Sequence, residues 1–286
     1  MLRNKIHHFI FFVCVAAFIS SASILGWQYV RGIWEENALK QLAQAKQSSQ
    51  YSASVSPDTA SQTSMEASAP VVLEQYDELS RQNADLIGWI KIDGTKIDYP
   101  VMYTGDDFYL HHSFNKASSK SGLPFIDKRC AVEPFGTNTI IYSHNMKNDS
   151  MFSGLLKYKS SDYYAEHPII RFDTLYEEQE YEIVAAFESE VYRKGVTVFK
   201  HYNFLNADNQ ANFDDYIARI KEHSLYDTGI HPEYGDALIT LMTCSYHTEN
   251  GRFVVVARKT DILYPPAIKP GKHKCPESRC QFHPVP

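Results

Sequence analysis

The feature that most constrains this chain is an uncharged apolar run near its start, at residues 9–30. The run reads FIFFVCVAAFISSASILGWQYV, and about 20 such residues are needed for a helix to cross a bilayer. Arg3 and Lys5 precede the run, whereas acidic residues soon follow Arg31, and this charge bias places residues 1–8 in the cytoplasm. The pattern predicts a single transmembrane signal-anchor followed by an extracellular remainder.

A cleaved signal peptide is the alternative interpretation of the same run. Ser20, Ser21 and Ala22 are the small residues that a signal peptidase favours after a short apolar stretch. The uncleaved anchor is preferred because the apolar run continues past that site to Tyr29. Both interpretations export the protein.

Composition divides the rest of the chain into three parts. Residues 31–70 are rich in Ser, Gln and Ala and predict a flexible stalk, although residues 36–47 have a composition suited to a helix near the membrane. Residues 71–260 carry the apolar patterns of a folded domain. Residues 261–286 are rich in Pro and Lys and predict a disordered tail.

The folded domain reads as mostly β-structure. A short helix is expected first, because Leu73, Tyr76 and Leu79 are spaced for one helix face. Short β-rich segments separated by turn residues follow and predict a barrel or sandwich: residues 89–92, 95–102, 138–143, 168–172, 181–187, 237–243 and 252–258. One longer helix is expected over residues 209–223, where apolar side chains recur at helical spacing before the strand that ends in a cysteine.

The strongest chemical signal lies between the last two predicted strands. Cys244 ends one of them, a polar turn follows, and Arg252 opens the next. If these strands pair as neighbours, the guanidinium returns to within reach of the thiol and favours the thiolate, which is the nucleophilic form. The alternatives without a catalytic role are that Cys244 is an inert buried cysteine and that Arg252 is a surface residue at the start of a strand.

A histidine stands at the end of another predicted strand. His144 directly follows the apolar stretch of residues 138–143, where it is placed to act as a general acid or base near neutral pH. From the residues alone its pairing with Cys244 is a guess, because the chain has 12 histidines. The whole chain has a formal net charge of -6, which leaves no basic stripe that would favour nucleic acid as a partner.

Taken together, these segments resemble the sortase family, and within it class B. The resemblance covers residues 86–259 and rests on GWIKIDGTKIDYPVM, DFYLHHSFNKASSKSGLPFID, TIIYSHNM and TLMTCSY, with Arg252 after it. The family signature TLxTC is matched by Thr240, Leu241, Thr243 and Cys244. The resemblance implies a closed β-barrel with an N-terminal helix and one long helix inserted before the cysteine strand.

The resemblance also implies a function, with no cofactor and no metal. Cys244 would attack the carbonyl of a Thr in a Pro-x-Thr-type sorting signal, His144 would protonate the leaving amine, and Arg252 would bind the signal and the developing oxyanion. An amine of a peptidoglycan precursor or a pilin would then take the acyl group, which fixes a surface protein to the cell wall of a Gram-positive bacterium. Four neighbours are expected to contact the substrate: Tyr142, Ser143, Met242 and Thr243.

Two departures from class B concern these neighbours. Class B members usually have Ser where this chain has Met242, and Gly where it has Ser143. The first change removes a hydroxyl near the nucleophile and is expected to alter substrate preference or rate. The second is expected to be harmless.

Other interpretations stay open beside this one. A secreted cysteine peptidase that only hydrolyses shares the first half-reaction, and an inactive membrane-tethered assembly module would keep the fold without the chemistry. The tail cysteines and histidines form a candidate zinc cluster, for which a disulfide or disorder is preferred: His273, Cys275, Cys280 and His283. An aspartate group lacks the spacing of a calcium loop and is better read as turn residues: Asp93, Asp98, Asp106 and Asp107.

Overall fold

The structure is a computed structural model that describes residues 2–55, 70–193 and 195–260. Its helices are α1 (Leu2–Val55), α2 (Glu74–Gln82), α3 (Ser161–Glu166) and α4 (Gln210–His223), with short 3-10 helices η1 (Phe108–Leu110), η2 (Phe152–Lys159) and η3 (His201–Asn203). Its strands are β1 (Leu86–Lys91), β2 (Asp98–Met102), β3 (Phe125–Ile126), β4 (Asn138–Tyr142), β5 (Ile169–Thr174), β6 (Glu180–Glu190), β7 (Leu238–Cys244) and β8 (Gly251–Thr260).

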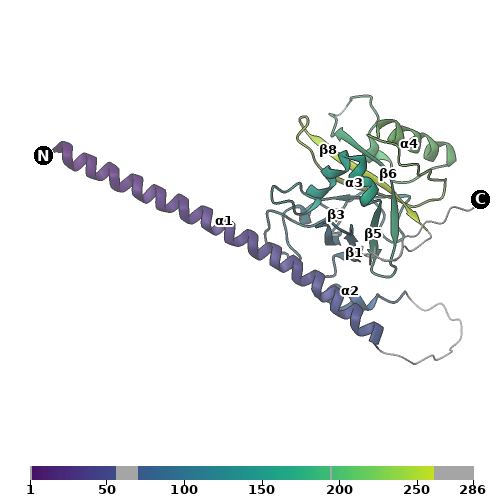
Figure 1. Ribbon diagram of the computed structural model, residues 1–286, viewed down its shortest axis with the longest axis horizontal. Coiled ribbons are helices and arrows are strands. Elements are labelled where there is room, and N and C mark those ends of the chain that lie inside the picture. Colours follow the sequence, from purple (N-terminus) through teal and green to yellow (C-terminus); the bar gives the residue numbers. More distant parts are fainter. Residues whose placement is uncertain (1, 56–69, 194, 261–286) are drawn as a thin grey trace, which may run out of the picture.

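The strands close into one barrel, in the order β1-β2-β3-β4-β7-β8-β6-β5 (Figure 1). The expectation of a mostly β, closed barrel with an N-terminal helix and a long helix before the cysteine strand is therefore confirmed. Strand β3 has only two residues, too few to show the alternation by which strands are recognised in a sequence. It closes the barrel by pairing parallel with β2 and antiparallel with β4.

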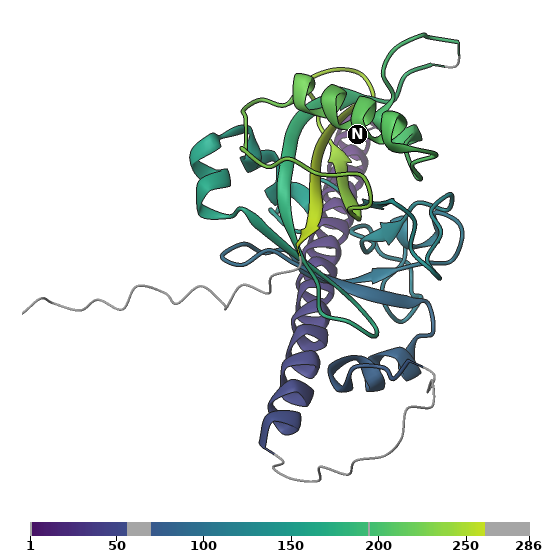
Figure 2. The ribbon, with the colours of Figure 1, turned by 90° about the vertical axis from the view of Figure 1, so that its right-hand side faces the viewer.

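Alternation along the strands separates a barrel interior from an outer face. On β7, Ile239 and Leu241 pack into the interior cluster, whereas Leu238 and Met242 belong to a second cluster outside the barrel wall. This second cluster is completed by α4, in the connection between β6 and β7. The predicted apolar stripe of α4 is buried there in full: Phe213, Tyr216, Ile217 and Ile220. In Figure 2, α4 lies over the end of the barrel farthest from α2.

Helix α1 contains a segment that is apolar and long enough, by length and composition, to cross a membrane. It is continuous from Leu2 to Val55, and Figure 1 shows its N-terminal part projecting well beyond the barrel. The helical start expected for the stalk is thus present. However, Leu39, Leu42 and Ala43 pack against a third apolar cluster, which α2 forms with β1 and η1, so the part of the stalk up to Lys46 is attached to the domain. Composition did not indicate this contact, because so few apolar residues make it.

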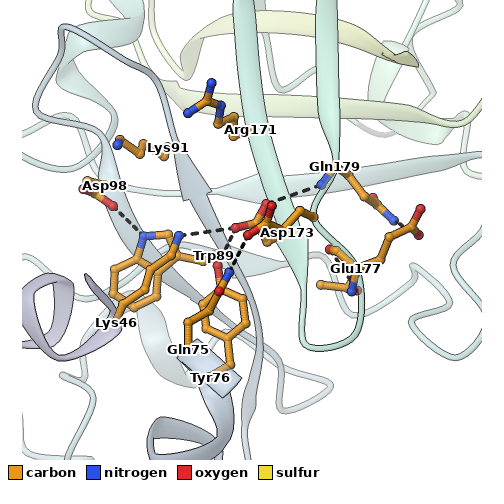
Figure 3. Close-up of polar contacts among 12 residues, drawn as sticks. Lys46, Gln75, Tyr76, Trp89, Lys91, Asp98, Arg171, Asp173, Glu177 and Gln179 are labelled. Atoms are coloured by element: carbon orange, nitrogen blue, oxygen red, sulfur yellow. Dashed lines mark hydrogen bonds and ion pairs between the residues drawn. The ribbon is translucent and has the colours of Figure 1, made fainter. Parts of the chain in front are cut away.

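A charged contact fixes the same helix to the barrel (Figure 3). Lys46 Nζ lies 3.3 Å from Asp173 Oδ2 on β5 and 5.2 Å from the ring centroids of both Tyr76 and Trp89. The Tyr76 hydroxyl donates a 2.5 Å hydrogen bond to the same carboxylate oxygen. The ammonium is held in a largely buried socket made by α2, β1 and β5. This burial lowers the pKa of Lys46.

Residues 56–69 of the predicted stalk and the whole tail, with its Cys/His cluster, lie outside the described residues. The domain boundaries proposed for those parts remain predictions.

Candidate active site

The β7–β8 pair brings the candidate nucleophile and the candidate arginine together. Cys244 is the last residue of β7, and it is directly opposite Arg252 in the antiparallel register. Opposite residues point to the same face, with Cβ atoms about 5 Å apart. That face is the outer one, because Met242 two residues earlier belongs to the outer cluster. The thiol and the guanidinium therefore both lie on the outer face of the barrel wall.

The parallel pairing of β4 with β7 places the candidate histidine at the same edge. Tyr142 lies opposite Met242, so the residues that follow both strands leave the barrel side by side. By this register His144 comes level with Cys244. Because both strands run in the same direction, their carboxyl ends meet at one rim of the barrel.

Three hydrogen bonds hold this rim. The amide of Ser143 donates to the Met242 carbonyl at 3.2 Å, and Thr243 Oγ1 donates to the Ser143 carbonyl at 2.9 Å. Asn145 Nδ2 donates to the carbonyl of Cys244 itself at 2.9 Å. Asn145 thus ties the segment after His144 to the backbone of the candidate nucleophile. Nothing in the sequence marks Asn145 as a site residue, since a lone Asn after a strand is an ordinary turn residue.

A backbone carbonyl fixes the tautomer of the histidine. His144 Nε2 lies 2.8 Å from the carbonyl oxygen of Leu110, at the end of η1. A carbonyl only accepts, so Nε2 carries a proton in this contact, and in the neutral ring Nδ1 is the nitrogen that accepts a proton. Leu110 acts here through its backbone, which leaves no signal in its residue type.

A cleft of about 550 Å³ contains all seven predicted site residues. They are Tyr142, Ser143, His144, Met242, Thr243, Cys244 and Arg252. Two larger cavities, of about 790 and 640 Å³, lie along α1 and include none of the seven. Size alone would point to those cavities, but the predicted site residues line the smaller cleft.

Arg252 is oriented by its own turn. Its Nη1 donates to the carbonyls of Asn250 and Gly251, at 3.2 and 2.9 Å. Among the residues that the structure describes, no hydrogen-bond acceptor is paired with its Nε or Nη2. These donors are free to bind a substrate carbonyl or an oxyanion in the cleft.

A second charged group forms one wall of the cleft. Arg129 donates to Asp127 through Nε at 2.9 Å and Nη2 at 2.6 Å, and the Tyr142 hydroxyl donates to the same carboxylate at 2.9 Å. Burial tends to raise the pKa of Asp127, but these hydrogen bonds outweigh it and the net pKa is lowered. The carboxylate therefore stays ionised and holds the Tyr142 side chain in place. Asp127 lies within a stretch that carried the family resemblance, but its charge had not marked it as a site residue.

The other cysteine of the domain is excluded as a nucleophile. Cys130 is 5% exposed, and its thiol contacts the backbone of Asn138 and Ile140. Burial raises its pKa to about 11. At neutral pH the Cys130 thiol is protonated and inaccessible, whereas Cys244 is partly exposed in the cleft.

Two of the aspartates considered for calcium, Asp98 and Asp106, have structural partners. Asp106 Oδ1 accepts from Thr104 Oγ1 and from the Phe108 amide, and Asp98 accepts from the indole N–H of Trp89. Within the described ranges no group of three or more His, Cys, Asp or Glu side chains is arranged to hold a metal ion.

Comparisons with known proteins agree with this geometry. The Sortase domain family matches residues 90–260 of the chain. Sortase B of Listeria monocytogenes is 34% identical over 187 residues, 64% of this chain and 73% of the relative. Sortase B of Staphylococcus aureus is 29% identical over 191 residues, 65% of this chain and 75% of the relative.

Solved structures share the fold. The Staphylococcus aureus sortase B–substrate complex superimposes with a TM-score of 0.68 at 24% identity, covering 81% of this chain and 98% of that one. A mutant form of Clostridium perfringens sortase B gives a TM-score of 0.59 at 30% identity, covering 66% and 87%. The family match over residues 90–260 contains β2 to β8 and includes His144, Cys244 and Arg252. The chain belongs to the sortase family and within it to class B, whose members are cysteine transpeptidases.

Proposed function

We propose that this enzyme cleaves a Pro-x-Thr-type sorting signal after the Thr and transfers the resulting acyl group to a cell-wall amine. In this proposal Cys244 is the nucleophile, His144 the proton carrier and Arg252 the oxyanion and substrate ligand. The observation that carries the proposal is the strand register, which brings three residues 8 to 108 positions apart to one rim of a single cleft.

The first half-reaction forms a thioacyl enzyme. The Cys244 thiol gives its proton to the His144 ring, the sulfur attacks the Thr carbonyl carbon, and the carbonyl electrons move onto an oxygen that faces the free donors of Arg252. As the C–N bond breaks, the leaving amine takes a proton from the His144 ring. The contact with the Leu110 carbonyl orients that ring through Nε2, which leaves Nδ1 as the position for transfer.

The second half-reaction reverses these roles. The neutral His144 ring accepts a proton from an incoming amine, the amine nitrogen bonds to the acyl carbon, and the C–S bond breaks to restore Cys244. Because water is far more concentrated than any amine, transfer requires that the cleft position the acceptor and keep solvent from the thioester. A peptidoglycan-stem or pilin amine is the proposed acceptor.

The apolar part of α1 is proposed as a single-pass membrane anchor, with the barrel on the outer side of the cell membrane. The length and composition of the helix support a span, and the charge bias around residues 9–30 supports the orientation. The two partners are then surface proteins bearing the sorting signal and a wall precursor at the same membrane.

Ligation by the full chain in detergent micelles tests the proposal. A sorting peptide and a stem-peptide amine are supplied, and hydrolysed and ligated products are measured by mass spectrometry over a range of amine concentrations. The ligated product should rise at the expense of the hydrolysed one, and both Cys244→Ala and His144→Ala should form neither. Cys130→Ala is the matched control, because it removes the other cysteine of the domain. If no amine diverts product from hydrolysis, the acceptor proposal fails.

A further inference from the structure

A polar cluster lies at the barrel rim immediately after the nucleophile. Glu188, on β6, is opposite Phe253 in the register with β8 and so points to the interior side of the wall, away from Cys244 and Arg252. Its Oε1 accepts a long hydrogen bond from Ser245 Oγ at 3.5 Å. His247 Nδ1 lies 3.5 Å from the same oxygen and 2.9 Å from Ser245 Oγ.

The segment that meets Glu188 is the turn of residues 245–250, which joins Cys244 to Arg252. The base of the turn is closed by backbone hydrogen bonds, from the Ser245 amide to the Gly251 carbonyl at 2.9 Å and from the Gly251 amide to Thr248 at 3.1 Å. The start of β8 lies very close to the residue that follows β7, because a Cβ added at Gly251 would lie 2.3 Å from the Ser245 carbonyl oxygen. A shift of the turn is therefore transmitted directly to both strand ends.

Glu188 is also tied to a third element. Lys159 Nζ, at the end of η2, lies 2.5 Å from Glu188 Oε1 and 6.0 Å from the centroid of the Phe253 ring. The hydrogen bond from Lys159 lowers the pKa of Glu188, so the carboxylate is ionised at neutral pH. Lys159 balances this charge. The carboxylate can therefore lie beside Ser245, the residue that follows Cys244, without a net negative charge that would oppose formation of the thiolate.

We propose that Glu188 is a positioning residue for the transpeptidation reaction. It holds the 245–250 turn through Ser245 and His247 against η2, and thereby keeps Cys244 and Arg252 at their working separation in the cleft. The inference deepens the proposed function and rests on the roles given there to Cys244 and Arg252. A displacement of about 1 Å between reacting groups can cost on the order of a hundredfold in rate, so an anchor at this turn matters more than one elsewhere on the barrel.

The test compares Glu188→Ala with Glu182→Ala in the full chain in detergent micelles. Glu182 is the matched control, because it lies on the same strand and pairs across to β8 through Arg258, far from the cleft. For Glu188→Ala, kcat on a sorting peptide should fall about tenfold to a hundredfold, with KM changed much less and the melting temperature no lower than in the control. Glu188→Gln, which keeps the acceptor oxygen but not the charge, should retain an intermediate kcat.

Coupling to the turn is the second readout. Since Glu188 acts through His247, adding His247→Ala to Glu188→Ala should cause little further loss of kcat. If Glu188→Ala unfolds, the kcat of the isosteric Glu188→Gln decides. Wild-type kcat in the folded Glu188 variants, or an equal loss in Glu182→Ala, would overturn the inference. Cys244→Ala separates the two hypotheses: if it stays active, the proposed function fails, and if it is inactive while Glu188 variants are normal, only the positioning role fails.

Discussion

Asp173→Asn should release helix α1 from the barrel while leaving the barrel folded. The substitution is isosteric. Its amide oxygen can still accept from the Gln179 backbone N–H, which lies 3.4 Å from Oδ1, and its NH2 group, in the place of Oδ2, can donate to the Tyr76 hydroxyl, which lies 2.5 Å away. It removes the charge that faces Lys46. The aspartate has other partners, whereas the Lys46 ammonium has only this carboxylate as a hydrogen-bond acceptor among the described residues.

The size of the effect follows from the contact. At 3.3 Å and an effective dielectric constant of about 20, the attraction is about 5 kcal/mol before desolvation. Desolvation already lowers the pKa of Lys46, so the ammonium bears a cost that Asp173 only partly offsets. Without Asp173, the desolvation cost of the buried ammonium is unopposed, and docking of α1 should weaken by roughly 2 to 4 kcal/mol. The loss is smaller than the full attraction because the ammonium regains its hydration when the helix undocks. This corresponds to on the order of 30-fold to 1000-fold in the docking equilibrium.

Hydrogen exchange measured by mass spectrometry on the full chain in micelles would report the release. Peptides from residues 31–49 should lose protection, because most of the stability of a helix in a protein comes from tertiary packing, while peptides from β7 and β8 keep theirs. Asp215→Asn, in an exposed pair with Arg219 on α4, is the control. Adding Lys46→Met to Asp173→Asn should restore protection, because no buried charge then remains. Unchanged protection in Asp173→Asn, or no recovery in the double variant, would refute this account of docking.

Other predictions concern the cleft. Ser143→Ala should stabilise the protein to heat by roughly 1 kcal/mol, because its buried hydroxyl has no hydrogen-bond partner among the described residues; a lower melting temperature would contradict this. At pH 8 iodoacetamide should modify Cys244 and spare Cys130, whose pKa is raised to about 11 by burial, as peptide mapping would show. Arg252→Lys should lower kcat/KM at least tenfold, because an ammonium lacks the forked donors; near-normal kinetics would reduce the residue to a structural role. The pKa of Asp127 is lowered in the folded state, so its stabilising contribution is lost as pH falls through that lowered pKa; Asp127→Asn should flatten acid unfolding below about pH 4.

The sequence predicted most of the strands because their residues alternate or are continuously apolar, and it predicted α4 because one stripe of four residues repeats at helical spacing. The strand pattern left a barrel and a sandwich open, and the resemblance supplied the closed barrel. The sequence also identified the three candidate catalytic residues, through the TLxTC motif and the resemblance to sortases. Each of these signals lies within a short stretch of chain. The resemblance supplied the pairing of His144 with Cys244, which the residues alone left as a guess.

The tertiary structure decided which distant residues meet. The parallel register of β4 with β7 set His144 level with Cys244, and a backbone carbonyl of Leu110 fixed the orientation of the ring. The anchor of the nucleophile turn by Glu188 likewise joins segments far apart in the chain. Neither contact has a periodicity or a residue-type signature, because a carbonyl is present at every position and a surface glutamate is common.

Docking of α1 shows the same division most clearly. The composition of residues 31–70 indicates a solvated stalk, since few of its residues are apolar. Only the fold creates the socket of Tyr76, Trp89 and Asp173 that receives Lys46, because its walls come from a helix and two strands separated by up to 97 positions. A buried charge is stable only where a partner and polarisable rings are already in place, and that condition is a property of the assembled barrel rather than of any segment.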